Sequence, residues 1–459
     1  MTRWRIPLIA GVAGATIVGA IYLYNFVSAR QVERQLYVPK PTRITPEIVL
    51  LQQYVRIDTS NPPGNETAGA RFLAGLLERG GVHAEVIESA PGRGNVYARI
   101  RGKRPGEGLM LLNHIDVAPA DPRGWRYPPF AARASLNMVW GRGTLDMKGV
   151  ALCQLDAFLA LARTRRTPER DVIFLGTADE EAGGTMGVAW LLAHRPDIFD
   201  GVRYVLNEGG INESFMEQFK YMGIEIGSKM IVKAELRAPS CQAMQQVRIA
   251  LEPYISPRDP DRVLPEVRAF LHDLAPRRVQ QGVLLDDIVR TVAQGKFWLV
   301  ERPYREVTQN VVWAAEIAAD ARGATMLVAL FNLPDENPDA RLAWLRDFVR
   351  PYGATVEKVL EKSGPATLSP RNTPLFALIT EEAHRQWGAP VGTEFLNTEY
   401  NDSRYLRPRG IVCYGMWPFE VDTYQTQGIH SIDERVRIDW YLDGVAFLRR
   451  LVARYAMEP

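Results

Sequence analysis

Short apolar runs alternate with helix-like segments between residues 46 and 206. Leu109–Leu112 and Val172–Leu175 are apolar throughout, Val202–Leu206 is largely so, and the helical pattern of Met147–Thr164 separates the first two. Strands that are buried on both faces have this continuous apolar character, and parallel neighbours are joined by helices. The alternation therefore predicts an α/β fold in which helices cover both faces of a mainly parallel sheet. Two helices and two strands are predicted ahead of these runs, at Pro46–Arg56, Ala68–Arg79, His83–Glu88 and Asn95–Ile100.

Polar residues follow each of the three apolar runs. The runs lead into Asn113–Val117, Asp179–Glu181 and Asn207–Gly210. Ligands of parallel sheets gather at the carboxyl ends of the strands. Three adjacent acids would repel one another and lose hydration there, so a cation is expected beside them, most simply one or two metal ions. A solvated acidic loop is the alternative.

Residues in and between these segments suit a site with two metal ions. His114 is a good zinc ligand, and Asp116 can bind the other ring nitrogen and orient the imidazole. Asp146, in a glycine-rich segment just before the predicted helix, can bridge two cations roughly 3.5 to 4 Å apart. Of the adjacent Glu180 and Glu181, one can bind metal while the other acts as the general base for an attacking water.

Several longer segments carry a resemblance to a known family. They are NHIDVAPA from Asn113, WGRGTLDMKG from Trp140, TADEEAGG from Thr177, LNEGG from Leu206, SNPPGNE from Ser60, NDSRYLRPRG from Asn401 and GIHSIDERV from Gly428. In this order and spacing they resemble the site motifs of the zinc-dependent exopeptidases and amidohydrolases that include aminoacylase, glutamate carboxypeptidase and carboxypeptidase S. The branch of carboxypeptidase S and the N-acyl amino acid hydrolases is the most similar.

The resemblance implies a centre of two Zn²⁺ ions, with Co²⁺ or Mn²⁺ as possible substitutes. One zinc would be held by His114 and Glu208 and the other by Glu181 and His430, with Asp146 bridging the two. It also implies a cis peptide bond between Asp146 and Met147.

Further roles follow from the same resemblance. Glu180 would be the general base and Asp116 the acid that orients the metal-binding imidazole, with Asp179 in support. Arg404 is a candidate clamp for a substrate carboxylate, because a guanidinium can bind a carboxylate through two parallel hydrogen bonds. A structural ion pair within its loop is the alternative for Arg404.

These roles predict dizinc-dependent hydrolysis of a peptide or N-acyl amide bond next to a free carboxylate. The substrate would be a small peptide or an N-acyl amino acid. An aminopeptidase or dipeptidase on the same metals is one alternative, which would need an anionic group for a free amine. A weakly active metal-binding scaffold is the other, because the middle of the chain departs from the family.

That middle part, residues 228–363, is expected to be a smaller α+β lid and a surface for homodimer formation. It would interrupt a catalytic domain formed by residues 46–227 and 364–459. In the family, the strand that opens the lid is followed by a histidine that contacts the substrate oxyanion, and a later segment reads Asn-Val-Xaa-Pro. Here Arg237–Met244 follows the opening strand and contains no histidine, and Asn310–Trp313 ends in tryptophan. Arg237 and Gln242 are the candidate replacements for the histidine.

The amino terminus carries an uncharged apolar segment. No charged side chain occurs in residues 6–29, which is long enough to cross a bilayer as a helix. It predicts a single-pass signal anchor, followed by a linker over residues 30–45, with the catalytic domain outside the cytoplasm, in the periplasm or a lumen. Helix pairing in the membrane is a second route to a homodimer. A cleaved signal peptide, which would make the protein secreted, is the alternative.

The charge balance argues against nucleic acid as the main partner. The chain has 55 basic and 53 acidic residues, a net charge of +2, and no long run of one sign. Its three cysteines, Cys153, Cys241 and Cys413, have no metal-like spacing and describe no disulfide framework.

Overall fold

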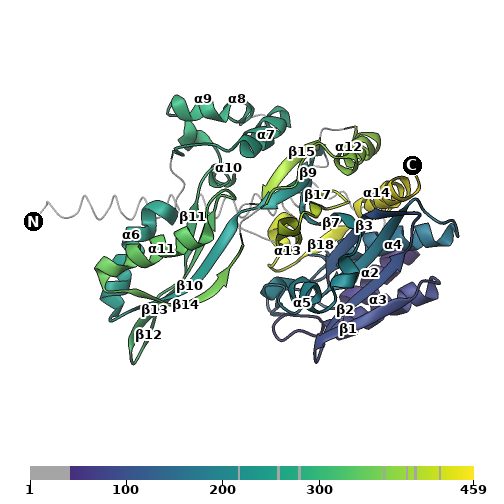
Figure 1. Ribbon diagram of the computed structural model, residues 1–459, viewed down its shortest axis with the longest axis horizontal. Coiled ribbons are helices and arrows are strands. Elements are labelled where there is room, and N and C mark those ends of the chain that lie inside the picture. Colours follow the sequence, from purple (N-terminus) through teal and green to yellow (C-terminus); the bar gives the residue numbers. More distant parts are fainter. Residues whose placement is uncertain are drawn as a thin grey trace, which may run out of the picture.

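The computed structural model describes residues 42–215, 218–255, 259–277, 281–364, 367–388, 391–396, 401–422 and 425–458. Within these ranges the strands form a ten-stranded, a five-stranded and a three-stranded sheet. Figure 1 shows the five-stranded sheet lying beside the larger one, with helices packed against both.

The ten-stranded sheet has a parallel centre. β6, β3, β7 and β16 are parallel neighbours, whereas β1 and β2 pair antiparallel at one edge and β8 and β9 do so near the other. The strand order is β1-β2-β6-β3-β7-β16-β9-β8-β17, and β15 pairs with β9. The strands are β1 (Ala84–Ala90), β2 (Arg93–Ile100), β3 (Arg104–His114), β6 (Arg170–Thr177), β7 (Val202–Gly210), β8 (Asn212–Phe215), β9 (Gln218–Ser228), β15 (Val391–Leu396), β16 (Val412–Met416) and β17 (Val421–Asp422). The predicted α/β fold with a mostly parallel sheet is confirmed.

Side chains alternate between two apolar layers along the central strands. Leu109 and Leu111 of β3 pack into one core, and Met110 and Leu112 pack into the other. The first core contains α2 (Pro46–Val55), α3 (Glu66–Arg79), α4 (Lys148–Arg163), α12 (Pro374–Trp387) and α14 (Ile438–Met457). The second contains α5 (Val188–His194) and α13 (Ser403–Leu406). Both faces are covered by helices, which explains the continuous apolar runs Leu109–Leu112 and Val172–Leu175 within these strands.

Two of these helices begin at the sequence signals that favour a helix start. The Thr45 and Thr373 hydroxyls accept hydrogen bonds from backbone N–H groups in the first turns of α2 and α12, and a proline follows each threonine. Helix α3 begins before the predicted Ala68, and strand β2 begins before the predicted Asn95.

The five-stranded sheet is antiparallel and lies within the predicted lid segment. It consists of β10 (Met230–Ala238), β11 (Val311–Ala314), β12 (Ala318–Asp320), β13 (Gly323–Asn332) and β14 (Thr355–Lys362). Helices α6 (Cys241–Ile255) and α11 (Pro338–Val349) supply its core. β9 ends at Ser228 and β10 begins at Met230, so that a single residue, Lys229, separates these two strands of different sheets. The boundaries of the lid as a domain stay a prediction.

The remaining elements form two smaller groups. Helices α7 (Pro265–Leu274), α8 (Gly282–Asp286), α9 (Ile288–Ala293) and α10 (Arg302–Glu306) surround a separate apolar cluster that includes Tyr221 of β9. The three-stranded sheet contains β4 (Arg133–Ser135), β5 (Met138–Trp140) and β18 (Arg435–Arg437).

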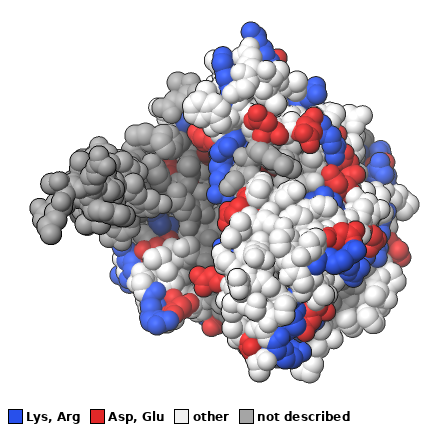
Figure 2. All heavy atoms as spheres, turned by 90° about the vertical axis from the view of Figure 1, so that its left-hand side faces the viewer, with Lys and Arg blue, Asp and Glu red and all other residues white. Residues whose placement is uncertain are grey.

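The predicted single-pass membrane location is contradicted by the helices of the described residues. Among the described residues, none forms a helix both long and apolar enough to cross a bilayer. Residues 6–29, on which the prediction rested, lie outside the described part of the chain, as does most of the predicted linker. Figure 2 shows that acidic and basic side chains are interspersed on the face that it presents.

Candidate metal centre

The structure brings the predicted metal ligands together from several parts of the fold. His114 is the last residue of β3, and Glu208 lies near the end of the parallel neighbour β7. Glu181 lies in a short 3-10 helix, Glu180–Ala182, that follows β6. Asp146 precedes α4, and His430 lies in the loop before β18. Neighbouring parallel strands end at the same edge of the sheet, which explains why residues far apart in the sequence meet here.

Asp146 lies between two imidazole–carboxylate pairs. Its Oδ1 atom is 3.0 Å from Nε2 of His114, and its Oδ2 atom is 2.9 Å from Nε2 of His430. The same His114 nitrogen is 3.4 Å from Oε2 of Glu208, and the same His430 nitrogen is 3.0 Å from Oε2 of Glu181. The five side chains therefore form two half-sites that share one carboxylate.

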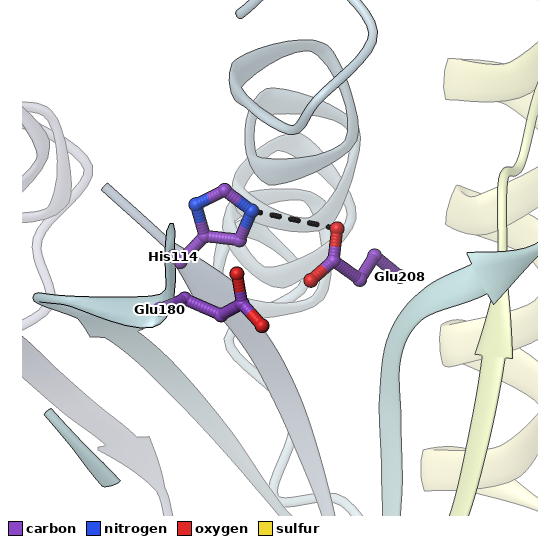
Figure 3. A group of neighbouring side chains, drawn as sticks. All are labelled: His114, Glu180 and Glu208. Atoms are coloured by element: carbon purple, nitrogen blue, oxygen red, sulfur yellow. Dashed lines mark ion pairs between the residues drawn. The ribbon is translucent and has the colours of Figure 1, made fainter. Parts of the chain in front are cut away.

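Glu180 lies next to the half-site that contains His114 and Glu208. Figure 3 shows its carboxylate beside His114 and Glu208. One ligand atom from each of these three residues lies within 4.8 Å of the other two, and the same holds for His114, Asp146 and Glu181. Both groups have the nitrogen and carboxylate donors that a divalent metal ion such as zinc binds.

Burial makes this concentration of acids unfavourable without positive charge. Burial, and then the charge of Asp146, raises the pKa of Glu208 to about 8. Burial and the charge of Glu208 raise the pKa of Glu180 well above its ordinary range. Hydrogen bonds to Asp146 and Glu181 raise the pKa of His430 to about 11. A divalent cation would supply that charge and leave the histidine neutral and the acids ionised, so the donor set fits a metal ion.

Asp116 is fully buried and contacts both His114 and the backbone of Glu180 and Glu181. Its backbone carbonyl is 2.9 Å from Nδ1 of His114, closer than its carboxylate Oδ1 at 3.4 Å. The carboxylate accepts hydrogen bonds from the backbone N–H groups of Glu180 and Glu181, both at 3.1 Å. Asp116 thus contacts the imidazole mainly through its backbone carbonyl. Its carboxylate holds the backbone of the adjacent Glu180 and Glu181, here called the acid pair, which the sequence did not indicate.

Glu434, in the segment GIHSIDERV, holds the loop of Asp146 and was not among the predicted site residues. Its Oε1 atom accepts hydrogen bonds from the backbone N–H groups of Leu145, at 2.8 Å, and Asp146, at 3.2 Å. Its Oε2 atom is 2.7 Å from Nη1 of Arg142, and both side chains are buried. Glu434 therefore ties the loop of the shared aspartate to the loop of His430. The Asp146–Met147 peptide bond in this loop is cis, as expected.

Comparison with known proteins identifies the family. The sequence model of peptidase family M20/M25/M40 matches residues 110–454, which include the five side chains of the two half-sites and Glu180. The chain belongs to this family. It is therefore a hydrolase of the M20 type.

Individual members of the M20 family resemble the chain over nearly its whole length. Aminoacylase-1 of Mus musculus is 32% identical over 428 residues, which cover 90% of this chain and 96% of the relative. The M20 metallo-carboxypeptidase of Sulfolobus solfataricus has a TM-score of 0.69 at 17% identity, covering 90% of this chain and 99% of that one. A dinuclear metal-binding M20 peptidase of Bacillus subtilis has a TM-score of 0.52 at 13% identity, covering 88% and 97%. The last two likenesses show a shared fold.

In this M20 chain Arg404 lies outside the group of candidate metal ligands. It is in α13, and its Nη2 donates a hydrogen bond of 2.6 Å to the carbonyl of Gly183, just after the acid pair. Its Nη1 is 3.2 Å from Oε1 of Glu361 on β14. Both residues line a cavity of about 110 Å³, together with Lys229 and Met230. Arg404 thus connects the loop of the metal centre to the five-stranded sheet.

The predicted replacements for the missing lid histidine have other surroundings. Arg237 is near the far end of β10 from Met230, where it pairs with Glu357 at 2.6 Å and Asp320 at 3.1 Å. Gln242 is exposed at the start of α6. Asn310 bonds within the lid segment, accepting a hydrogen bond from the backbone N–H of Leu333 at 2.7 Å. Within the part of the chain that is described, no contact joins Arg237 or Gln242 to the metal-binding group.

Proposed function

We propose that this M20-family hydrolase uses two zinc ions to cleave a peptide or N-acyl amide bond next to a free carboxylate. The observation that carries the proposal is the position of Asp146, whose two carboxylate oxygens face two different histidines at about equal distance. A single carboxylate in that position can bridge two cations. The similarity to aminoacylase-1 supports an N-acyl amino acid substrate, and the dinuclear metal-binding relative supports the number of ions.

In this proposal His114 and Glu208 would hold one ion, Glu181 and His430 would hold the other, and Asp146 would be shared by both. Two ions so bound would polarise the substrate carbonyl and make a water molecule at the site more acidic.

Glu180 would act as the general base and then as the general acid. It accepts a proton from the attacking water and later donates it to the leaving amine. Its carboxylate lies beside His114 and Glu208 (Figure 3), with one ligand atom of each of the three residues within 4.8 Å of the other two. The backbone N–H groups of Glu180 and Glu181 are fixed by Asp116, so the base and the neighbouring ligand keep a constant spacing.

A set of paired substrates tests the proposal. We expect turnover of N-acetyl amino acids and of amino-blocked dipeptides that end in a free carboxylate, and loss of turnover when the same carboxylate is amidated. Products would be identified by mass spectrometry, with bound metal quantified in the same preparation. Turnover only of substrates with a free amino group would favour an aminopeptidase or dipeptidase. Bound metal without turnover of any substrate would favour a metal-binding scaffold.

Glu361 is expected to compete with the substrate carboxylate if Arg404 is the clamp. Replacing Glu361 with glutamine should lower KM for free-carboxylate substrates about two- to fivefold, since a partly buried ion pair contributes up to about 1 kcal/mol. Steady-state kinetics would measure this. Glu357→Gln, on the same strand but paired with Arg237, should leave KM unchanged. An unchanged or higher KM in Glu361→Gln would remove Arg404 from the proposed role.

A further inference from the structure

Arg93 holds two buried acids behind the metal centre. This first residue of β2 places Nη2 2.7 Å from Oε1 of Glu66 and 2.6 Å from Oδ1 of Asp179. The side chains of the two acids are 0% and 6% exposed, and that of the arginine is 15% exposed. Two buried carboxylates close to one another repel, so the guanidinium between them stabilises both. None of these three residues has a role in the proposed mechanism.

The backbone conformation of Asp179 sets the direction of the chain at Glu180 and Glu181. Asp179 immediately precedes Glu180 and has a φ of 72°, in the left-handed region that a residue other than glycine rarely adopts. Its carboxylate accepts hydrogen bonds from the Thr185 hydroxyl, at 2.9 Å, and from the backbone N–H of Met186, at 3.0 Å. Its own N–H donates to Glu66 at 3.2 Å. These contacts and the ion pair with Arg93 offset an unfavourable backbone conformation.

Asn61 links the same aspartate to the other support of the acid pair. Its Nδ2 donates hydrogen bonds to Oδ2 of Asp116, at 2.9 Å, and to Oδ1 of Asp179, at 3.1 Å. Asp116 in turn accepts the backbone N–H groups of Glu180 and Glu181. The acid pair is therefore held through Asp179, which precedes it, and through Asp116, which binds its backbone. The side chains of Asn61, Asp116 and Asp179 are almost fully buried.

We propose that Arg93 is a positioning residue for catalysis. By holding Asp179 against Glu66, it fixes the backbone conformation that directs Glu180 towards the substrate and Glu181 towards its metal ion. This inference rests on the proposed function, since it takes the roles of the two glutamates from there. It adds that the relative positions of Glu180 and Glu181 depend on the guanidinium of Arg93, which would contact neither the substrate nor a metal ion.

Arg99 provides a matched control on the same strand. It also lies on β2 and pairs at 2.7 Å with a buried aspartate, Asp171, and the two side chains are 7% and 9% exposed. Asp171 is near the start of β6, however, whereas Asp179 follows the end of that strand. Both arginines therefore join β2 to β6 or its following loop through a buried ion pair, but only Arg93 is connected to the acid pair.

The test compares Arg93→Ala with Arg99→Ala. We expect Arg93→Ala to lower kcat about 10- to 100-fold with KM within about threefold, because a displacement of about 1 Å in a catalytic group costs up to a hundredfold. Chelator competition should show that one of two ions binds about 10-fold more weakly, as when a residue behind a metal ligand is removed. Arg99→Ala should change both quantities less than about twofold. Melting temperatures of both variants would report the loss of stability that the two share.

A conservative variant separates charge from bulk. Arg93→Lys keeps a cation near both acids and should recover part of the lost kcat and metal affinity. Equal effects of Arg93→Ala and Arg99→Ala, or no recovery in Arg93→Lys, would overturn the inference. Failure of the proposed function has a different signature, because the unaltered protein would then bind no metal or hydrolyse no amide substrate.

Discussion

Replacing Glu180 with glutamine is expected to lower kcat by about a hundred- to ten-thousandfold, the range typical of a lost general base. Glutamine has nearly the same shape but cannot accept the proton of the attacking water. Because Glu180 is not among the five proposed ligands, the variant should keep two bound ions. KM should change little, since the carboxylate acts on water and not on the substrate in the ground state. Kinetics and metal analysis of the same preparation would measure these quantities.

Glu382→Gln is the control for this variant. Glu382 is a fully buried glutamate in α12 that pairs with Arg450 and Arg454, so it resembles Glu180 in burial but not in position. Its replacement should affect stability and leave kcat within about twofold, as residues distant from a site usually do. Unchanged turnover in Glu180→Gln would exclude it as the base. Loss of metal together with turnover would indicate that Glu180 is a ligand.

The second large effect is expected from Asp146→Asn. The substitution keeps the shape of the side chain but replaces one anionic oxygen with an amide group that cannot bridge two cations. We expect bound metal to fall from two ions per chain to one or none. Turnover should fall about a thousandfold or more, because a metal ion stabilises the transition state by several kcal/mol and each 1.4 kcal/mol is about a factor of ten.

Asp156→Asn is the matched control for the aspartate. Asp156 lies in α4, shortly after Asp146, and pairs with Arg449. The two aspartates have similar side-chain exposure, 18% and 14%. The control variant should bind two ions and keep its turnover. Two tightly bound ions in Asp146→Asn would show that the carboxylate does not bridge, and the metal centre would then have to be assigned to other side chains.

The proximity of most candidate ligands could be predicted from the sequence, because they lie at strand ends or in adjacent loops. In a parallel sheet the position of a strand end is fixed by the topology, and the apolar runs before His114 and Glu208 indicated that topology. The resemblance to family motifs added His430, which no local pattern would have indicated. The roles of these residues stay predictions until the variants are measured.

The connecting residues could not be predicted in the same way. Arg93 meets Asp179 across 86 residues, and Glu434 meets Leu145 across 289. A lone arginine or glutamate in a sequence gives no indication of which buried acid or backbone group it will face, because that choice depends on the packing of several elements. For the same reason the surroundings of Arg237 could not be predicted, since its two acidic partners lie on β14 and β12 of the lid sheet.

The one-residue junction between β9 and β10 constrains how this chain can evolve. Lys229 is buried, and its ammonium group donates hydrogen bonds to the carbonyls of Glu306 and Gln309, both at 2.6 Å. Because side chains alternate along a strand, inserting one residue at this point would turn every side chain of β10 to the opposite face of its sheet. Its apolar residues would leave the lid core, and its pairing with β13 and β14 would shift. The length of the chain at this junction is therefore constrained by the packing of the whole lid sheet.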